Sequence, residues 1–583
     1  MKYTSRFAYF KGGTNIPLAW KFILFLEVAI WIPLIFIGFD PHHDGLILTT
    51  VHLTQDAIRF DNAWPFNQYG PSWALIYSAF TWGLPDNLVF LGLRFMTVFF
   101  YILTAWIVWK ISLLFLSRRN SFLSVLIYFF TQPFVSGLGS DLVAWPSAFL
   151  MPIIAFIVFA SVSLVDNSKK LSQLLYLAFA IGAALPIVLL TRAQIGLLTF
   201  AIEIVWFITL RNRQFIFLFI SGLVTSSSIL VIFLLKQNFL WDSIYDEFVF
   251  GSSYLRGDRS SYPTPIFTTL GVMVFLTMQL FSRAIKRYFI SVLRVPFLRT
   301  AAFLTLILSG LVLIFLLLGD HSNLITILLR RFWISLYLAI IISCLLIQFR
   351  KSFSTWRNNR AFTPELTRRN FLLGLAIASQ SQVFPLFDQM HFWWGSVPAV
   401  VLVILTLKEE FAPWHISSQI IHAAISLVLV FFLSVGLIQW SQQVAQVMHP
   451  YPKSISQFLY VDPKISFDEK ELQAFFLKDI KPHSPVLNLC ENANVFFVNN
   501  QFKSSSRIFL LWTNILDNKE MVSEMVDSDP SYVVTCSMNR VPSSQRKAEI
   551  LQARMLARAL PERLLLSTYR QSNNMTWRIW SRG

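Results

Sequence analysis

Acidic and imidazole side chains gather directly after the first long apolar run of this sequence. The stretch Phe39-Asp-Pro-His-His-Asp-Gly45 contains Asp40, His42, His43 and Asp44, and Asp56 and Asp61 follow. Ionisable groups are costly in hydrocarbon, so such a group at a membrane boundary is either solvated surface or a site. A carboxylate about 3 Å from a hydroxyl can accept its proton as a new bond forms. The pattern therefore predicts acid–base chemistry at one face of a membrane.

A second polar stretch, residues 380–395, has a carboxylate and an imidazole three residues apart. On a helix, Asp388 and His391 would share one face, with Trp393 and Trp394 beside them. Aromatic rings next to polar groups favour the binding of a sugar ring. The spacing also permits a metal site, but no closed set of His, Asp and Glu is visible. We therefore expect no cofactor, with a divalent cation as the open alternative.

The composition indicates that membrane-spanning helices position these residues. Of the 583 residues 55% are hydrophobic, and the mean hydropathy is +0.57, outside the range of ordinary soluble domains. The net charge of +17 does not indicate a nucleic-acid partner, because Lys and Arg lie in short loops between apolar runs. The three cysteines exclude a disulfide-rich scaffold. Cys490 and Cys536 could pair in an oxidising compartment or be two independent buried thiols.

Apolar runs of about 20 residues predict thirteen spans. They cover residues 16–38, 87–114, 121–137, 142–165, 172–191, 194–210, 214–235, 265–282, 300–318, 324–348, 370–386, 395–407 and 416–440. Between the first two, residues 44–60 predict an amphipathic helix in the membrane plane, and residues 72–83 a re-entrant or interfacial piece. From a cytoplasmic N-terminus, every strongly basic loop falls on the cytoplasmic side, and the odd number of spans places the C-terminal region outside.

Residues 441–583 change to a polar composition, which predicts an extracytoplasmic domain after a transmembrane domain of residues 1–440. Alternating strand and helix patterns indicate a small α/β fold. The expected strands are Val486–Cys490, Asn494–Val498, Ile508–Trp512 and Tyr532–Cys536, with a helix over 544–559. A reporter that is active only in the cytoplasm should stay silent when fused after Arg570.

Further polar groups fall at span ends on the outer side. They include Tyr69 of the turn Tyr69-Gly-Pro71, Arg192 and Gln194 after the fifth span, and Arg330 and Arg331. Arginine suits bidentate contact with phosphate, although Arg94 and Arg192 could also be snorkelling side chains. The charges of loop 236–264 are mixed and spread, so we interpret that loop as solvated surface.

Together these features resemble the polytopic GT-C glycosyltransferases. The resemblance lies in one span followed by a large loop beginning Asp-Pro-His-His-Asp-Gly, an in-plane helix, the Tyr69-Gly-Pro71 turn and the Leu93-Arg94 pair. The chain is most similar to bacterial members akin to protein O-mannosyltransferases and lipid A aminoarabinose transferases. The stretch Phe384-Pro-Leu-Phe-Asp-Gln-Met-His391, followed by Trp-Trp, is similar to a late-loop motif of that group. The resemblance covers about residues 16–440.

This resemblance implies an inverting glycosyltransferase of the cytoplasmic (inner) membrane, active in cell-envelope glycan biosynthesis. It would move a hexose or pentose from a polyprenyl-phosphate donor to a hydroxyl of a glycan, lipid or protein. The position that matches the family's base is Asp44, but Gly45 follows it in place of Glu, which leaves Asp40 as a rival. The expected substrate ligands are His43, Asp61, Tyr69, Arg192, Gln194, Arg330, Arg331, Asp388, His391 and Trp394.

A polytopic transporter or flippase of a lipid-linked or small polar substrate is the alternative, and a non-catalytic scaffold is a third hypothesis. A transporter would place ionisable or helix-breaking residues in the middle of several spans. Most predicted spans are Leu, Ile, Phe and Val through their centres, with Pro186 and Pro398 as the exceptions. The polar groups lie at one face, which favours surface chemistry.

Overall fold

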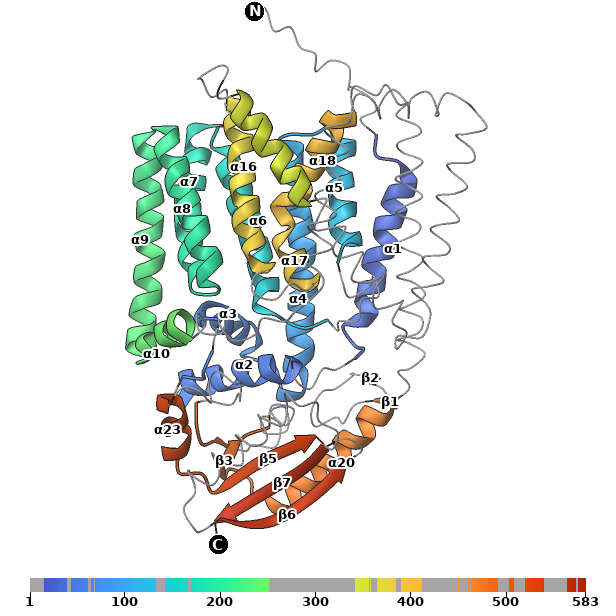
Figure 1. Ribbon diagram of the computed structural model, residues 1–583, viewed down its shortest axis with the longest axis vertical. Coiled ribbons are helices and arrows are strands. Elements are labelled where there is room, and N and C mark those ends of the chain that lie inside the picture. The colour runs from blue at the N-terminus through green and yellow to red at the C-terminus, as the bar shows by residue number, and fades with distance from the viewer. Residues whose placement is uncertain are drawn as a thin grey trace, which may run out of the picture.

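The structure is a computed structural model of a helical membrane part and a C-terminal domain, which lie at opposite ends of the molecule (Figure 1). The residues it describes are 15–38, 43–60, 64–67, 69–132, 142–165, 169–250, 341–355, 357, 364–383, 389–411, 449–450, 460–461, 463–490, 503–507, 519–538, 564–572 and 575–582.

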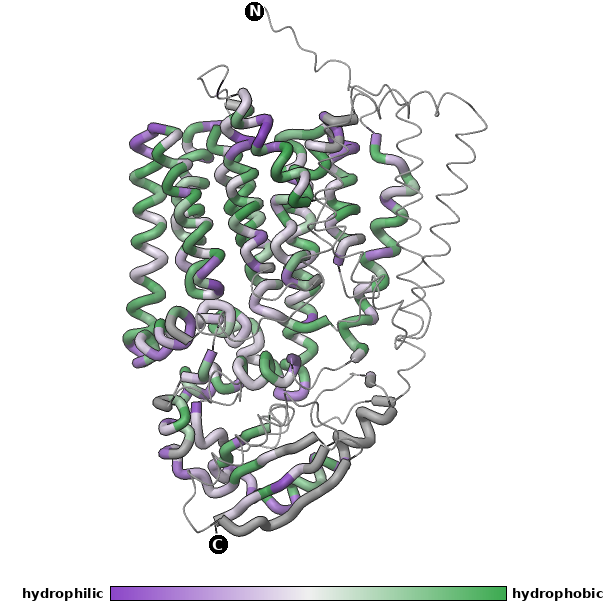
Figure 2. The backbone as a smooth tube through the Cα atoms, viewed as in Figure 1, coloured by the Kyte–Doolittle hydropathy of each residue, from purple (hydrophilic) through white to green (hydrophobic). Residues whose placement is uncertain are grey.

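Five described helices are long and apolar enough to cross a membrane. They are α4 (Asp86–Leu113), α6 (Pro146–Ser163), α7 (Leu171–Leu189), α8 (Ala193–Leu210) and α9 (Arg213–Lys236). They coincide with the predicted spans 87–114, 142–165, 172–191, 194–210 and 214–235, and hydrophobic residues predominate along them (Figure 2). The protein is therefore a helical polytopic membrane protein. The predicted spans 265–282, 300–318 and 416–440 lie outside the described residues, so the number thirteen stays a prediction.

Shorter helices complete the described part of the bundle. They are α1 (Leu18–Leu34), α5 (Arg118–Phe130), α16 (Pro364–Gln380), α17 (Gln389–Gly395), α18 (Val397–Phe411) and a helix over 341–355. The predicted span 370–386 corresponds to α16, which begins earlier and ends in the 3₁₀ turn η3 (Ser381–Val383).

Helices α7 and α9 cross with their backbones in close contact. A Cβ added to Gly182 would lie 2.0 Å from the carbonyl oxygen of Phe219, and one added to Gly222 would lie 2.0 Å from that of Phe179. Glycine on both sides permits this approach, as in small-residue contacts between membrane helices.

Two helices run across the ends of the long ones, on the side of the C-terminal domain (Figure 1). The predicted in-plane helix is confirmed as α2 (His43–Phe60), and the predicted short piece as α3 (Pro71–Thr81). Residues 44–51 are all buried, so the first half of α2 is enclosed by protein on every face. Gln55 donates to Ser78 O and to Thr81 Oγ1, each at 3.0 Å, which joins α2 to α3.

The C-terminal domain contains a five-stranded mixed sheet in the order β4-β3-β5-β7-β6. Its strands are β3 (Pro485–Asn488), β4 (Lys503–Ser504), β5 (Tyr532–Met538), β6 (Leu564–Ser572) and β7 (Met575–Arg582). Strand β3 runs parallel to β4 and β5, whereas β7 is antiparallel to β5 and β6. The domain also contains helices α20 (Pro463–Asp479) and α23 (Lys519–Asp527).

The sequence predicted two of these strands, β3 and β5, and missed the β6–β7 hairpin. The predicted strands Asn494–Val498 and Ile508–Trp512 and the helix 544–559 lie outside the described residues. Cys490 is disulfide-bonded and Cys344 is buried and free. The alternative of an independent buried thiol is therefore wrong for Cys490.

A short strand attaches this domain to the end of α1. Strands β1 (His449–Pro450) and β2 (Tyr460–Val461) pair antiparallel. Tyr460 N donates to Phe36 O at 2.8 Å, and Gly38 N donates to Tyr460 O at 3.0 Å. Helix α1 therefore begins at the far end of the bundle and ends at the C-terminal domain (Figure 1).

Candidate functional site

Four helix ends bring predicted site residues together on the side of the C-terminal domain. His43 begins α2, Tyr69 stands in the turn before α3, Arg192 caps the start of α8, and His391 and Trp394 lie on α17. Trp145, directly before α6, joins them. We name these six residues the Arg–His–aromatic cluster.

The contacts within the Arg–His–aromatic cluster form a continuous chain. The ring of Trp145 lies 4.9 Å from that of His43, 6.1 Å from that of Tyr69 and 6.1 Å from that of Trp394. Trp394 lies 5.1 Å from the ring of His391. Residues far apart in sequence thus share one environment of packed rings.

Arg192 is the cation at the centre of this chain. Its Cζ lies 4.9 Å above the ring of Tyr69, and its Nη2 lies 3.4 Å from Nε2 of His391. The side chain is buried and precedes the first turn of α8, where the helix dipole favours an anion. Gln194 lies in that same first turn. This end of the cluster can therefore hold a negatively charged ligand.

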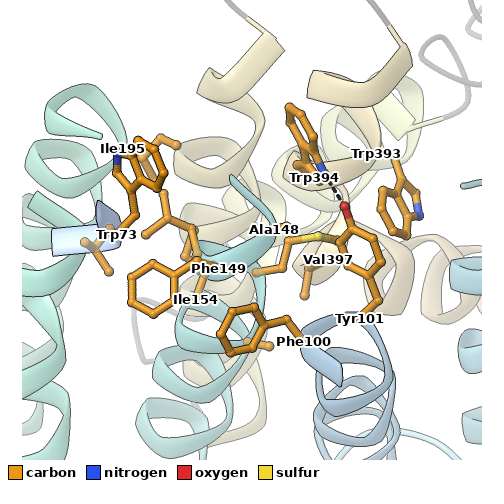
Figure 3. Close-up of a cluster of buried hydrophobic side chains, with 14 of the residues drawn as sticks. Trp73, Phe100, Tyr101, Ala148, Phe149, Ile154, Ile195, Trp393, Trp394 and Val397 are labelled. Carbon is orange, nitrogen blue, oxygen red and sulfur yellow. Dashed lines mark hydrogen bonds between the residues drawn. The ribbon is translucent and has the colours of Figure 1, made fainter. Parts of the chain in front are cut away.

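The two tryptophans of α17, which we expect beside a sugar, are both fully buried in this structure. Trp393 Nε1 donates to Tyr128 O at 2.9 Å, and Trp394 Nε1 points at the hydroxyl of Tyr101 at 3.4 Å (Figure 3). His43, Tyr69, Trp145 and His391 are only half-buried. Trp394 therefore supports His391 and Trp145 from inside the protein.

Asp44 forms a buried ion pair beside the cluster. Its Oδ2 accepts from Nη2 of Arg94 at 3.0 Å, and the two side chains are 3% and 1% exposed. Nη1 of Arg94 also donates to the carbonyls of Leu34, Ile35 and Ile37 at 3.3, 3.3 and 2.8 Å. The guanidinium thus joins α1, α2 and α4, and the interpretation of Arg94 as a snorkelling side chain is wrong.

A second buried acid lies in loop 236–264, for which the sequence predicts solvated surface. Asp246, in the π-helix η2 (Tyr245–Phe250), is fully buried. Its Oδ2 accepts from Arg507 Nη1 at 2.9 Å and from Asn67 N at 3.2 Å, and its Oδ1 accepts from Arg507 Nη2 at 3.3 Å. The solvated interpretation is therefore wrong for this residue. Short π-helical turns occur frequently at functional sites.

Burial governs the electrostatics of η2. Burial raises the pKa of Asp246 from 3.8 to about 6, although Arg507 and the N–H of Asn67 oppose the rise. The carboxylate is still ionised at neutral pH, so its contact with Arg507 is ionic. Burial also raises the pKa of Glu247 well above its ordinary 4.5, against a smaller opposing effect of the Ala193 N–H. Glu247 therefore favours the neutral acid more strongly than Asp246 does.

Gly70 explains how Glu247 approaches the turn that carries Tyr69. Its φ of +79° favours glycine, and an added Cβ would lie 2.2 Å from Oε2 of Glu247 and 2.6 Å from Leu190 O. The turn Tyr69-Gly70-Pro71 is therefore packed between η2 and the end of α7.

The remaining predicted site residues lie outside the described part of the chain. These are Asp40, Asp61, Arg330, Arg331 and Asp388. Among the described residues, no group of three or more His, Cys, Asp or Glu side chains could hold a metal ion. The sequence missed Trp145, Asp246, Glu247 and Arg507 as parts of the site. Of these four residues, only Asp246 and Glu247 had a feature in the sequence that could have indicated a site, namely two adjacent acids shortly after a span.

Two carboxyl groups lie buried within the bundle. Glu27 in α1 accepts from Gln132 Nε2 at 3.1 Å, and Glu203 in α8 accepts from Ser161 Oγ at 2.8 Å. The expectation that Pro186 and Pro398 are the exceptions among apolar span centres is therefore wrong. Each carboxyl has a neutral partner on another segment, which fits interhelical hydrogen bonding.

Comparisons with known proteins find likeness in structure only. No protein-family model matches the sequence, and no curated protein matches it. The structure is similar to the oligosaccharyltransferase of Archaeoglobus fulgidus tethered with an acceptor peptide. That match has 11% identity and a TM-score of 0.47, and covers 97% of this chain and 74% of that one. The structure is also similar to that of the same enzyme, AglB, in complex with an inhibitory peptide and a dolichol-phosphate. This match has 11% identity and a TM-score of 0.45, and covers 88% of this chain and 69% of that one.

The structure is also similar to ArnT from Cupriavidus metallidurans bound to undecaprenyl phosphate. The identity is 9% and the TM-score 0.42, with 96% of this chain and 97% of that chain covered. These matches extend over most of the chain. Similarity at this level says nothing about individual site residues.

Proposed function

We propose that the protein is an inverting glycosyltransferase that moves a hexose or pentose from a polyprenyl-phosphate donor to an acceptor hydroxyl. The observation that carries this proposal is the Arg–His–aromatic cluster, which joins a cation, two imidazoles and aromatic rings next to a first-loop carboxylate at the ends of membrane helices. A lipid-linked sugar needs a cation for its phosphate and polar and aromatic groups for its sugar ring, placed where the membrane helices end. The sequence motif of the first loop supports the same function.

Arg192 is the proposed partner of the carrier phosphate. A guanidinium at a helix N-terminus combines charge-assisted hydrogen bonds with a favourable dipole. Its place at the bundle end lets the polyprenyl chain remain among the lipids while the phosphate reaches the site. Gln194 can add a polar contact in the same turn. Arg330 and Arg331 remain predicted partners of the same phosphate.

The half-buried residues of the cluster are the proposed sugar ligands. The rings of Tyr69 and Trp145 offer apolar faces, and His43 and His391 offer ring nitrogens for hydroxyl groups. Trp394 acts by holding His391. Asp61 and Asp388 remain predicted ligands of sugar or acceptor hydroxyls.

The proposed base is a first-loop carboxylate, with Asp44 as the first candidate and Asp40 as the second. The acceptor oxygen attacks the anomeric carbon while the bond from that carbon to the phosphate oxygen breaks. The carboxylate takes the hydroxyl proton, and the lipid phosphate leaves as an anion stabilised by Arg192. Asp44 lies 3.0 Å from the guanidinium of Arg94, which fixes the direction of its carboxylate.

The test uses purified protein in lipid nanodiscs with a panel of polyprenyl-phosphate sugars. Asp44→Asn should lower turnover about 10²-fold or more, with donor binding near normal, and Asp40→Asn should cost less. The double variant Asp44→Asn/Arg94→Met removes both buried charges but also the donors to three carbonyls, so its Tm is measured together with its turnover. If the double variant transfers sugar at the wild-type rate, Asp44 is not the base. If Asp40→Asn is then inactive, the two roles exchange.

The proposed site faces the extracytoplasmic side of the inner membrane. The first loop and the C-terminal domain, proposed as residues 441–583, lie on the same side, opposite to the start of α1. The bonded Cys490 suits an oxidising compartment. Uptake by vesicles that contain the protein, with no sugar transfer from any donor, would favour the transporter hypothesis, to which the buried Glu27 and Glu203 lend some support.

A further inference from the structure

We infer that Arg507 of the C-terminal domain is a positioning residue of the Arg–His–aromatic cluster: through Asp246 and Asn67 it fixes the turn that carries Tyr69. This inference rests on the proposed function, since the cluster is where we place the donor. It gives the external domain a part in the geometry of the membrane site.

The first link joins the domain to two segments of the membrane part. The guanidinium of Arg507 binds both carboxylate oxygens of Asp246, at 2.9 and 3.3 Å. The carbonyl of Arg507 accepts from Phe66 N at 2.9 Å. A two-pronged contact fixes orientation as well as distance, so η2 and the end of the first loop are held by one residue.

The second link runs from Asp246 to the turn. Asn67 N donates to Asp246 Oδ2 at 3.2 Å. The side chain of Asn67 then closes the turn, since its Nδ2 donates to Gly70 O at 2.7 Å and its Oδ1 accepts from Tyr69 N at 3.1 Å. Asn67 is buried, so no solvent can replace these bonds without a local opening.

The third link reaches the cluster itself. Tyr69 lies under the guanidinium of Arg192 and against Trp145, and Arg192 in turn contacts His391. Glu247, next to Asp246, packs against Gly70. Displacement of η2 would therefore act on the turn both at Asn67 and at Gly70.

Two features separate positioning from simple attachment of the domain. The domain has its own attachment through Tyr460 and the end of α1, which does not involve Arg507. Arg507 also has a partner within its own domain, Glu524, at 2.9 Å from Nε, and that carboxylate is 40% exposed. Removal of Glu524 therefore supplies a matched control on the same guanidinium.

The experiment compares Arg507→Met, Asp246→Asn and Glu524→Gln in the full-length protein in nanodiscs. Hydrogen–deuterium exchange is measured on peptides that cover residues 64–72 and 190–196. Arg507→Met and Asp246→Asn should raise exchange in both peptides. Exchange in α4 should stay near the wild-type value, and so should the Tm of the protein. Glu524→Gln should leave the exchange unchanged. Arg507→Lys, which keeps the charge and loses the fork, should fall between wild type and Arg507→Met.

Transfer kinetics provide the second measurement. A catalytic geometry displaced by about 1 Å can cost about 10²-fold, so kcat/KM for the donor should fall by roughly ten- to a hundredfold in Arg507→Met and Asp246→Asn. The acceptor KM should stay at the wild-type value. Glu524→Gln should retain wild-type kinetics.

The outcomes separate this inference from the proposed function. Unchanged exchange in residues 64–72, or raised exchange with wild-type kcat/KM for the donor, overturns the positioning role. Equal losses in Glu524→Gln and Arg507→Met overturn it as well. If the wild-type protein transfers no sugar, the proposed function fails, and the exchange data alone then decide whether Arg507 holds the turn.

Discussion

Two Asp–Arg pairs hold the first loop, and they differ in what they connect. The membrane-side pair, Asp44–Arg94, lies within the helical part and also binds three carbonyls near the end of α1. The domain-side pair, Asp246–Arg507, joins the helical part to the C-terminal domain and is bidentate. Both acids are buried, but within the part of the chain that the structure describes only Arg507 has a second, exposed acidic partner.

The difference indicates that the two buried Asp–Arg ion pairs have different roles, one in folding and one in the geometry of the first loop. A buried pair contributes little net stability when compared with apolar residues, but loss of one partner leaves an uncompensated charge. Around Arg94 that charge would lie among the spans, so the membrane-side pair is primarily a condition for folding. When Asp246 is lost, the exposed Glu524 still pairs with Arg507. When Arg507 is lost, burial favours the neutral form of Asp246, so the domain-side pair primarily sets geometry.

The largest effect should come from breaking the membrane-side pair. Arg94→Met leaves Asp44 buried and removes donors from Leu34, Ile35 and Ile37, so it should destabilise the protein by about 3–5 kcal/mol. Thermal unfolding in detergent measures this loss. Arg59→Met is the control, because Arg59 is an exposed arginine over Trp82 and should cost about 1 kcal/mol or less. Equal effects of the two variants would contradict the structural role of Arg94.

The next effect concerns the turn between the two pairs. Gly70→Ala places a Cβ against Leu190 O and Glu247 at a positive φ, which should cost about 1–3 kcal/mol in backbone strain and lower sugar transfer. Gly83→Ala is the control, since an added Cβ there meets nothing within 4 Å. Measurement of Tm and turnover for both variants shows whether the added Cβ strains the turn and lowers sugar transfer. Wild-type behaviour of Gly70→Ala would show that the turn tolerates displacement.

Much of this architecture follows from local sequence. The five described spans, α2, α3, β3 and β5 were predicted, because span length and strand patterning are local properties. The sequence also predicted His43, Tyr69, Arg192, His391 and Trp394 as site residues. They lie near the ends of apolar runs, where a polar or amphipathic side chain indicates a possible site.

The pairings were not predictable in the same way. Asp246 and Arg507 are 261 residues apart, and loop 236–264 has charges of both signs, which is also the composition of solvated surface. Trp145 lies in an apolar stretch and resembles its neighbours. Glu27 and Glu203 are single acids in otherwise apolar runs, and their neutral partners become visible only when the helices are packed.

The smallest effect tests α2, the helix that begins at the membrane-side pair. Burial lowers the pKa of His52 from 6.5 to about 4, with Asp86 raising it and Arg59 lowering it by smaller amounts. Its Nε2 makes no hydrogen bond within the described part of the chain. Because the folded state resists protonation, the unfolded state takes up the proton first as the pH falls below 6.5. The contribution of His52 to stability is therefore present above pH 6.5 and lost as the pH falls toward 4.

Between pH 7 and pH 6 this loss should amount to about 0.5–1 kcal/mol, visible as a lower Tm at pH 6. His52→Gln removes the titrating group, so its Tm should change less over that interval than the wild-type Tm does. If His52→Gln and the wild type lose the same Tm between pH 7 and pH 6, His52 is accessible to protons in the folded state. The middle of α2 would then be more open to solvent than the lowered pKa of His52 indicates.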